Sequence, residues 1–213
     1  MYVVITGQSE FVVQLAKLFE AKGKNKTVLV VRDKEIATQL SHELHAIIVN
    51  ADSTDTKALD ELNLRECDAF ISATDSTKAN VLSAIYAKNA GAKKILVRVE
   101  NPSSEAILEK LGFISINADH FAANMVELMI TRPAVSDLVS INIGEFDMIE
   151  VLGKETNLVG KELGNAKGNN FTAIATYANA KYDFSKEKKI EPNDTVILLV
   201  NSGKEKQVEK ELK

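Results

Sequence analysis

The sequence of 213 residues contains one cysteine and three histidines. A single cysteine excludes a disulfide within the chain. Cys67 comes just before the apolar run DAFISA, and no base lies beside it, so we expect a buried structural thiol rather than a reactive one. The histidines (His42, His45 and His120) fall on expected helices or helix starts, and no pair of possible ligands has the spacing of a metal site.

The sequence also lacks a long hydrophobic run. No segment approaches the roughly 20 apolar residues that a membrane-spanning helix needs, so direct membrane insertion is not expected. The N-terminus enters a strand at once, without the basic, apolar and small-residue segments of a secretory leader. We therefore expect a cytoplasmic protein.

Positive charge is not in excess, because the formal net charge is −4 and the pI is about 5.5. This balance, together with the absence of a basic patch with aromatic residues, disfavours nucleic acid as a partner. The chain is 45% hydrophobic and 26% charged, which is typical of a soluble globular protein, and its length favours two modest domains over one large one.

The first 130 residues alternate between short apolar runs and amphipathic stretches. The near-continuous apolarity of these runs is typical of strands that are buried on both faces, as in a parallel sheet. The alternation predicts a Rossmann-like, doubly wound α/β domain over residues 1–132. Strands are expected at 2–6, 27–31, 46–49, 69–73, 94–99 and 113–117.

Apolar residues at helical spacing mark the expected packing faces of the helices. A last helix over 119–132 is expected to begin at an N-cap, Asp119, and to stop near Pro133. Its apolar stripe is Phe121, Met125, Leu128 and Met129. The packing faces of two earlier helices are Phe11, Val12, Leu15, Leu18 and Phe19 in one and Val81, Leu82, Ile85 and Tyr86 in the other.

From about residue 138 the pattern changes to strands without long helices between them. Residues 138–213 are predicted to form a small α+β C-terminal domain, and PAVSDLVS (133–140) is the expected boundary. YANAKY predicts a hairpin turn, and the charged segment GKEKQVEKELK predicts a solvated terminal helix. Strands are expected at 138–143, 148–152, 171–177 and 195–200.

The first strand is followed by Gly7-Gln8-Ser9-Glu10-Phe11-Val12, where a dinucleotide fingerprint would read G-x-G-x-x-G. Gly7 permits the tight turn, and a serine is a good N-cap, so the turn itself is kept. A carboxylate in the first helical turn satisfies the helix dipole and repels a diphosphate. These residues alone leave a nucleotide site and an ordinary turn equally open.

Strand two ends in Arg32-Asp33, where a nucleotide site needs an acid for the ribose. Asp33 could bind a ribose diol or only cap the next helix, and Arg32 would prefer a phosphate. The strand register leaves both alternatives open.

Three further strand ends carry polar or small residues that suit a ligand crevice. Because the carboxyl ends of parallel strands meet at one edge of the sheet, these residues are expected to lie close together. They are Ala51-Asp52-Ser53 after strand three, Ala73-Thr74-Asp75 after strand four, and Arg98 at the end of strand five.

Several motifs occur in an order that resembles the TrkA family, the regulatory subunits of Trk/Ktr-type potassium uptake systems, which contain RCK domains that regulate potassium conductance. The turn Gly7–Phe11 matches the family's glycine-rich turn, and NADSTD matches its G-D-A-T-D segment. Ala73, Thr74 and Asn80 match A-T-x-x-x-x-x-N, and RVENP matches R-V-x-N-P. In the second domain, NLVGKELGN and KIEPNDTVILLV follow in the expected order.

The resemblance implies a function that the residues alone do not. Such subunits bind NAD(H) or an adenine nucleotide, ADP or ATP, in the first domain, and the second domain senses a further ligand. They form homodimers through the last helix of the first domain and assemble into rings beneath a membrane potassium channel or transporter. The resemblance therefore implies a non-enzymatic protein held at the inner face of the membrane by its partner. The stripe of the last helix fits that dimer, although packing within its own domain is the alternative.

The chain departs from the family pattern at Glu10, where a basic residue is common, at two missing glycines, and at Arg32 near the acid position. We therefore expect weak nucleotide binding or a different ligand. Two other functions remain open: an NAD-dependent oxidoreductase, which would need a proton donor beside the nicotinamide, and a free-standing nucleotide sensor without a transporter.

Overall fold

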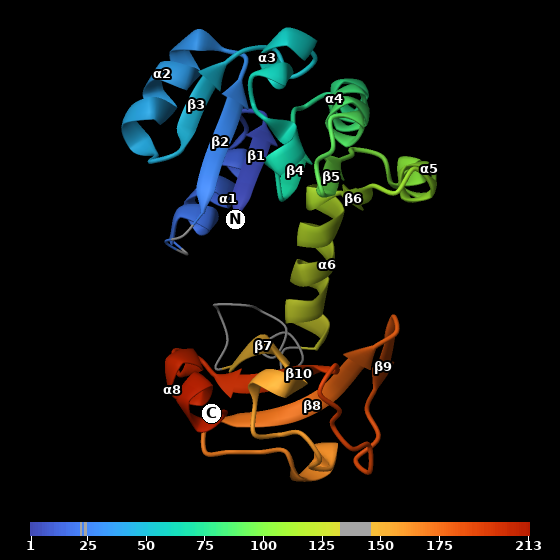
Figure 1. Cartoon of the computed structure of the whole chain (residues 1–213). Coiled ribbons are helices and arrows are strands. Elements are labelled where there is room, and N and C mark those ends of the chain that lie inside the picture. Colours follow the sequence, from blue (N-terminus) through green and yellow to red (C-terminus); the bar gives the residue numbers. More distant parts are fainter. Residues whose placement is uncertain (22, 24, 133–145) are drawn as a thin grey trace. The chain divides into compact units, whose positions relative to one another are not determined.

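The computed structural model describes residues 1–21, 23, 25–132 and 146–213 (Figure 1). These residues divide into two compact units, Met1–Ala123 and Asn124–Lys213. The expected boundary segment at 133–140 and the expected strand at 138–143 lie outside the described residues. The domain limits inferred from the sequence therefore stay a prediction.

The first unit contains a six-stranded parallel sheet with the strand order β3-β2-β1-β4-β5-β6. The order reverses direction at β1 and β4, the arrangement of a doubly wound fold. This confirms the Rossmann-like α/β fold expected from the alternating runs. The strands are β1 (Tyr2–Thr6), β2 (Lys26–Val31), β3 (Ile47–Asn50), β4 (Ala69–Ser72), β5 (Lys94–Arg98) and β6 (Ile114–Ile116).

Helices cover both faces of this sheet (Figure 1), and a core of buried side chains lies on each face. Val3 belongs to the core with α1 and α2, and its neighbour Val4 belongs to the core with α3, α4 and α5, since successive side chains of a strand point to opposite faces. The helices of this unit are α1 (Glu10–Ala21), α2 (Lys34–Glu43), α3 (Thr56–Asp60), α4 (Thr77–Asn89) and α5 (Glu105–Lys110), with short 3₁₀ turns η1 (Leu64–Glu66) and η2 (Pro102–Ser104). Helix α6 (Ala118–Thr131) begins in this unit and ends in the second.

Burial on both faces holds for the central strands and fails at the sheet edges. Every residue of β4 is buried, whereas Ile47 of β3 and Ile114 of β6 are exposed, because an edge strand is covered incompletely. Leu18, expected on the packing face of α1, is also exposed.

The expected packing face of α4 is confirmed only in part, because Val81 and Tyr86 pack against the core but the other two residues do not. Leu82 is 61% exposed and Ile85 is also exposed. Small residues let α4 lie close to the sheet, and their polar groups are bonded within the core. The buried residues of this helix are Asn80, Ser83, Ala84 and Ala87.

Helix α6 begins one residue before the expected N-cap. The Asn117 side chain accepts a hydrogen bond from the His120 amide (2.9 Å), so Asn117 is the N-cap and Asp119 lies in the first turn. No residue of α6 is buried. Within the part of the chain that the structure describes, no helix combines the length and apolarity needed to cross a membrane.

The second unit contains a four-stranded antiparallel sheet in the order β7-β10-β8-β9. Asn179 and Ala180 have positive φ angles (49° and 59°), which confirms the two-residue hairpin turn expected in YANAKY. The terminal helix is not fully solvated, because Val208 and Leu212 are buried in the core of this unit. Its elements are β7 (Phe146–Leu152), η3 (Gly153–Glu155), η4 (Leu163–Asn165), β8 (Phe171–Ala178), β9 (Lys181–Asp183), β10 (Thr195–Asn201) and α8 (Glu205–Glu211).

The buried thiol provides a test of the fold. Cys67 is fully buried, its Sγ donates to the Ala69 carbonyl (3.1 Å), and burial raises the pKa of the thiol. Because the thiolate is the nucleophile, we expect the native protein to react with a disulfide reagent at pH 8 at least about a thousandfold more slowly than the unfolded chain, given a stability of about 5 kcal/mol or more. The chain in guanidinium chloride is the control, and complete reaction of the native protein within seconds would contradict this burial.

Candidate functional site

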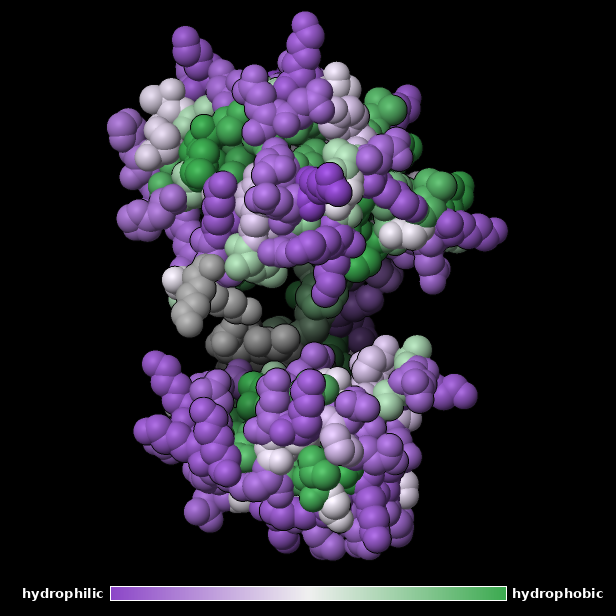
Figure 2. All heavy atoms as spheres, in the orientation of Figure 1, coloured by the Kyte–Doolittle hydropathy of each residue, from purple (hydrophilic) through white to green (hydrophobic). Residues whose placement is uncertain are grey.

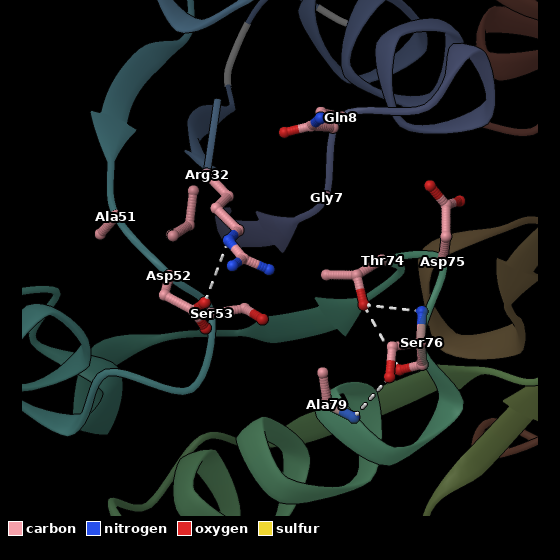
Figure 3. Close-up of a pocket in the computed structure, with 11 residues that line it drawn as sticks. Gly7, Gln8, Arg32, Ala51, Asp52, Ser53, Thr74, Asp75, Ser76 and Ala79 are labelled. Atoms are coloured by element: carbon pink, nitrogen blue, oxygen red, sulfur yellow. Dashed lines mark hydrogen bonds and ion pairs between the residues drawn. The ribbon is translucent and has the colours of Figure 1, made fainter. Parts of the chain in front are cut away.

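A cavity of about 300 Å³ lies at the carboxyl edge of the parallel sheet (Figure 3). Its walls come from the ends of β1 to β4 and from the first turn of α4. This is the edge at which open α/β sheets bind ligands. The lining residues are Gly7, Gln8, Val30, Arg32, Ala51, Asp52, Ser53, Thr74, Asp75, Ser76 and Ala79.

The turn after β1 requires glycine at its first position. Gly7 has a φ angle of +130°, and a Cβ atom there would lie 2.5 Å from the carbonyl oxygen of Ala73 at the end of β4. The Gly7 amide donates to the Val30 carbonyl (3.0 Å), which ties the turn to β2. Gly7 thus allows the ends of β1, β2 and β4 to meet around the cavity, with Ala73 buried beneath it.

The rest of the turn starts helix α1 without further glycines. The Ser9 carbonyl accepts bonds from the Val12 and Val13 amides (2.9 and 3.2 Å), so α1 begins directly after it. Val12, at the place of the third fingerprint glycine, is fully buried in the core. Glu10 is exposed and accepts a bond from the Gln14 amide group (2.6 Å), outside the cavity lining.

Arg98 lies beside the cavity rather than in its lining. Its Nη1 donates to the Ser9 hydroxyl (3.3 Å) and contacts the Asp75 carboxylate (3.4 Å), and its guanidinium carbon lies 5.8 Å from the centre of the Phe11 ring. Arg98 therefore links the end of β5 to the turn after β1 and to the loop after β4.

The structure separates the two residues that follow β2. The Asp33 carboxylate accepts bonds from the Glu35 and Ile36 amides (2.8 and 3.0 Å) and is the N-cap of α2. The Asp33 amide donates to Gln8 (3.1 Å). Arg32, in contrast, lines the cavity, and Figure 3 shows its guanidinium pointing between Asp52 and Thr74. Of the two alternatives for Asp33, the structure favours the cap.

Asp52 holds the loop after β3. Its Oδ1 accepts bonds from the amide and the hydroxyl of Thr54 (2.8 and 2.7 Å), and its Oδ2 lies 3.4 Å from Nε of Arg32. The hydroxyl bond from Thr54, then its amide bond and the nearby Arg32 charge, lower the pKa of Asp52. The carboxylate is therefore ionised at neutral pH. The neighbouring Ser53 is buried in the cavity wall.

A buried amide supports the wall formed by β4. The Oδ1 of Asn80 accepts bonds from the Thr74 amide (2.8 Å) and hydroxyl (2.6 Å), and its Nδ2 donates to the carbonyls of Thr74 and Arg98 (both 2.9 Å). The loop then turns into α4 at Ser76, which caps the Ala79 amide (3.3 Å). Asn80 thus fixes the ends of β4 and β5 together.

The structure brings together the strand ends that the sequence indicated, but not every expected residue lines the cavity. Gly7, Asp52 and Thr74, which it expected to meet, line one cavity, and Arg98 lies beside it. Three lining residues were not expected from the sequence: Val30, Ser76 and Ala79. The signal for Ser76 and Ala79 was a serine able to cap the next helix, three residues before an alanine. The expected site residues outside the lining are Ser9, Glu10, Phe11, Asp33, Ala73 and Arg98.

The site offers no metal centre among the residues that the structure describes, since no group of three or more histidine, cysteine, aspartate or glutamate side chains is placed to hold an ion. Its chemistry is that of a polar cleft with the Arg32 guanidinium, the carboxylates of Asp52 and Asp75 and several hydroxyl groups. Such a cleft can hold an organic molecule that carries both hydroxyl and phosphate groups.

Comparison with known proteins assigns the chain to a family. Residues 3–120, more than half of the chain, match the TrkA-N domain. The chain belongs to this family.

Relatives of known name cover most of the chain. The Trk system potassium uptake protein TrkA homolog of Methanothermobacter thermautotrophicus is 32% identical over 181 residues, 84% of this chain and 83% of that protein. The homolog of Pyrococcus abyssi is 24% identical and covers 92% of this chain and 88% of its own length. A structure of the GsuK channel bound to NAD covers 94% of this chain and 37% of its own, with a TM-score of 0.53 and 15% identity, a likeness of fold alone.

Because Gly7 lies so close to the carbonyl group of Ala73, a larger residue at position 7 should destabilise the fold. We expect Gly7→Ala to lower the free energy of unfolding of the first unit by about 2–4 kcal/mol, because the strained φ angle and the contact with the Ala73 carbonyl oxygen add together. Gly23→Ala in the same unit is the matched control: its φ is +70°, nothing lies within 4 Å of a Cβ there, and about 1 kcal/mol is expected. Denaturant unfolding measures both, and equal losses would contradict the packing at Gly7.

Proposed function

We propose that the protein is a regulatory subunit of a potassium transport system, which gates a membrane partner through nucleotide-dependent changes in the shape of a homo-oligomer. The observation that carries this proposal is the cavity at the carboxyl ends of β1 to β4 in a chain of the TrkA-N family. The relatives' names connect that family with potassium uptake.

The proposed ligand of the cavity is an adenine nucleotide, either NAD(H), ADP or ATP. Its volume of about 300 Å³ is at the lower end of the range of small-molecule sites. The small side chains of Ala51, Ser53 and Ala79 leave room for a flat base, and the NAD-bound GsuK channel has a related fold. We expect the affinity to be weak, because Glu10 places a negative charge in the first turn of α1, where the second and third glycines are also missing.

The proposed partner is a membrane-embedded potassium transporter or channel subunit, and this protein would lie at the inner face of the membrane through that contact. The support is the family and the names of its members. A free-standing nucleotide sensor of the same fold is the second candidate, and co-purification with a transporter distinguishes the two.

Exposed apolar side chains support assembly into an oligomer. On α6, Phe121 is 64% exposed and Ile130 is 77% exposed, and this helix is the proposed dimer contact. Further apolar residues lie on α4 and α5, where Figure 2 shows a green surface over the position of α5. Apolar surface of this kind marks contact with other proteins. The exposed apolar residues of these two helices are Leu82, Ile85 and Ile107, and the exposed Leu111 directly follows α5.

We propose no catalytic activity. A hydride-transfer enzyme needs a proton donor or base beside the nicotinamide, usually histidine, tyrosine or lysine. Among the described residues, the cavity lining contains none of these three. Turnover of a nicotinamide cofactor by the purified protein would favour the oxidoreductase instead.

The proposed function predicts nucleotide binding that changes transport. Calorimetry of the full chain with NAD, NADH, ADP and ATP should give saturable binding with dissociation constants weaker than about 1 μM, or −8 kcal/mol. Addition of the best ligand should change ⁸⁶Rb⁺ flux through the co-purified transporter in vesicles, since a ligand shifts an assembly when its affinity differs between two shapes. Vesicles with the transporter alone are the control. If none of the four nucleotides binds, the proposed nucleotide site is contradicted. Binding without an effect on flux would favour the free-standing sensor.

The proposed dimer predicts the effect of a charge on α6. Phe121→Glu should weaken self-association at least about 25-fold, because an aromatic residue at the centre of a contact contributes about 2 kcal/mol or more. Ala123→Glu introduces the same charge at an exposed position of the same helix, about 200° around its axis from Phe121, and should change little. Sedimentation velocity over a concentration series measures both, and an unchanged dimer in Phe121→Glu would contradict this contact.

A further inference from the structure

We infer that the cavity selects a nucleotide with a phosphate on its adenosine ribose, as in NADP(H), over one with a free ribose diol, as in NAD(H), and that Arg32 makes this selection. The inference rests on the proposed nucleotide site and names its ligand class more narrowly.

Arg32 occupies the position from which a Rossmann-type site identifies the ribose. It is the first residue after β2, and it lines the cavity. In this fold an acid at the end of the second strand bonds the ribose hydroxyls, whereas an arginine there accommodates the 2′-phosphate. Its side chain is 82% exposed, and Figure 3 shows the guanidinium directed into the cavity between Asp52 and Thr74.

The acid that would bind a ribose diol is occupied elsewhere. Asp33 directs its Oδ1 to the Glu35 and Ile36 amides at the start of α2, and its own amide is bonded to Gln8. It does not line the cavity. Without the Asp33 carboxylate, the end of β2 presents a cation to the ribose.

Asp52 is the remaining carboxylate near Arg32, and it leaves most of the guanidinium available. The ion pair joins Oδ2 of Asp52 to Nε of Arg32 at 3.4 Å, and the Oδ1 of Asp52 accepts hydrogen bonds from Thr54. A guanidinium has five N–H donors, and those of its two Nη atoms remain for a phosphate. An exposed ion pair of this length is weak, and a dianionic phosphate can compete with it.

The other charged groups around the cavity do not replace Arg32. Asp75 lies on the far wall in Figure 3 and contacts Arg98, which is outside the lining. Within the described part of the chain, Arg32 is the one cationic residue in the lining. A phosphate on the ribose therefore has a single cationic partner in this cavity.

Calorimetry with matched ligand pairs tests the inference on the full chain. The pairs are NADP⁺ with NAD⁺, and adenosine 2′,5′-bisphosphate with 5′-AMP, which differ only by the 2′-phosphate. We expect the phosphorylated member of each pair to bind at least about tenfold more tightly, the effect of a charge-assisted bidentate contact. Arg32→Gln should bring both ratios close to one, and Arg32→Asp should favour NAD⁺.

Lys34→Gln is the matched control, because Lys34 is an exposed cation two residues away that does not line the cavity. Lys34→Gln should leave the affinity ratio of each ligand pair unchanged. It removes the same charge as Arg32→Gln, so it distinguishes an effect of net charge from the loss of a direct contact with the phosphate. Circular dichroism checks that the variants fold, as expected for an exposed side chain. Equal or tighter binding of NAD⁺ by the natural sequence, or an unchanged ratio in Arg32→Gln, would overturn the selection by Arg32 while the nucleotide site stands. Failure of every ligand to bind at millimolar concentration would overturn the proposed site itself.

Discussion

The cavity depends on one buried amide, that of Asn80. This side chain is almost fully buried in α4, and it bonds the backbone of Thr74 after β4 and of Arg98 at the end of β5. Burial of an amide is unfavourable unless its donors and acceptors are paired. Here both Nδ2 donors have partners and the oxygen accepts several bonds, so the amide stabilises the observed arrangement of the β4 and β5 ends beside the cavity. An apolar side chain of similar size would leave the Thr74 amide without this partner in a partly buried place, at a cost of about 1–3 kcal/mol.

The same constraint acts from the other side through Gly7. The β1 turn contacts the carbonyl of Ala73, the residue just before Thr74, so closely that no side chain fits between them. The end of β4 is thus held by α4 on one side and by the β1 turn on the other. Since β1 and β4 are the strands at which the sheet reverses its order, the cleft of the fold opens at this point. Ser9 and Val12 stand at the places of the other two fingerprint glycines, and the Val12 side chain packs in the core there.

Much of the fold and the general place of the site followed from the sequence, because both depend on patterns along the strands. Apolar runs marked the strands, and the polar residues directly after them met at one sheet edge. The face of α4 could be predicted only in part, since hydropathy also favours Leu82 and Ile85, whereas close packing of the helix on the sheet requires the small residues Ser83 and Ala84. Nor could the roles of Arg32 and Asp33 be assigned, because the start of α2 decides which of the two neighbours becomes the cap.

These features indicate how a ligand in the proposed cavity could affect an assembly. A ligand shifts an equilibrium between two shapes only by the difference between its affinities for them, typically 1–3 kcal/mol or about 5- to 150-fold. The backbone around Gly7 and Thr74 is fixed by packing and by Asn80, so in the proposed regulation contacts with it would be the same in both shapes. The Arg32 and Asp75 side chains are mostly exposed, and the fold fixes them far less. Rigid contacts contribute affinity without selecting a shape, so we propose that the selection comes from those two charged side chains and from the loops that carry them.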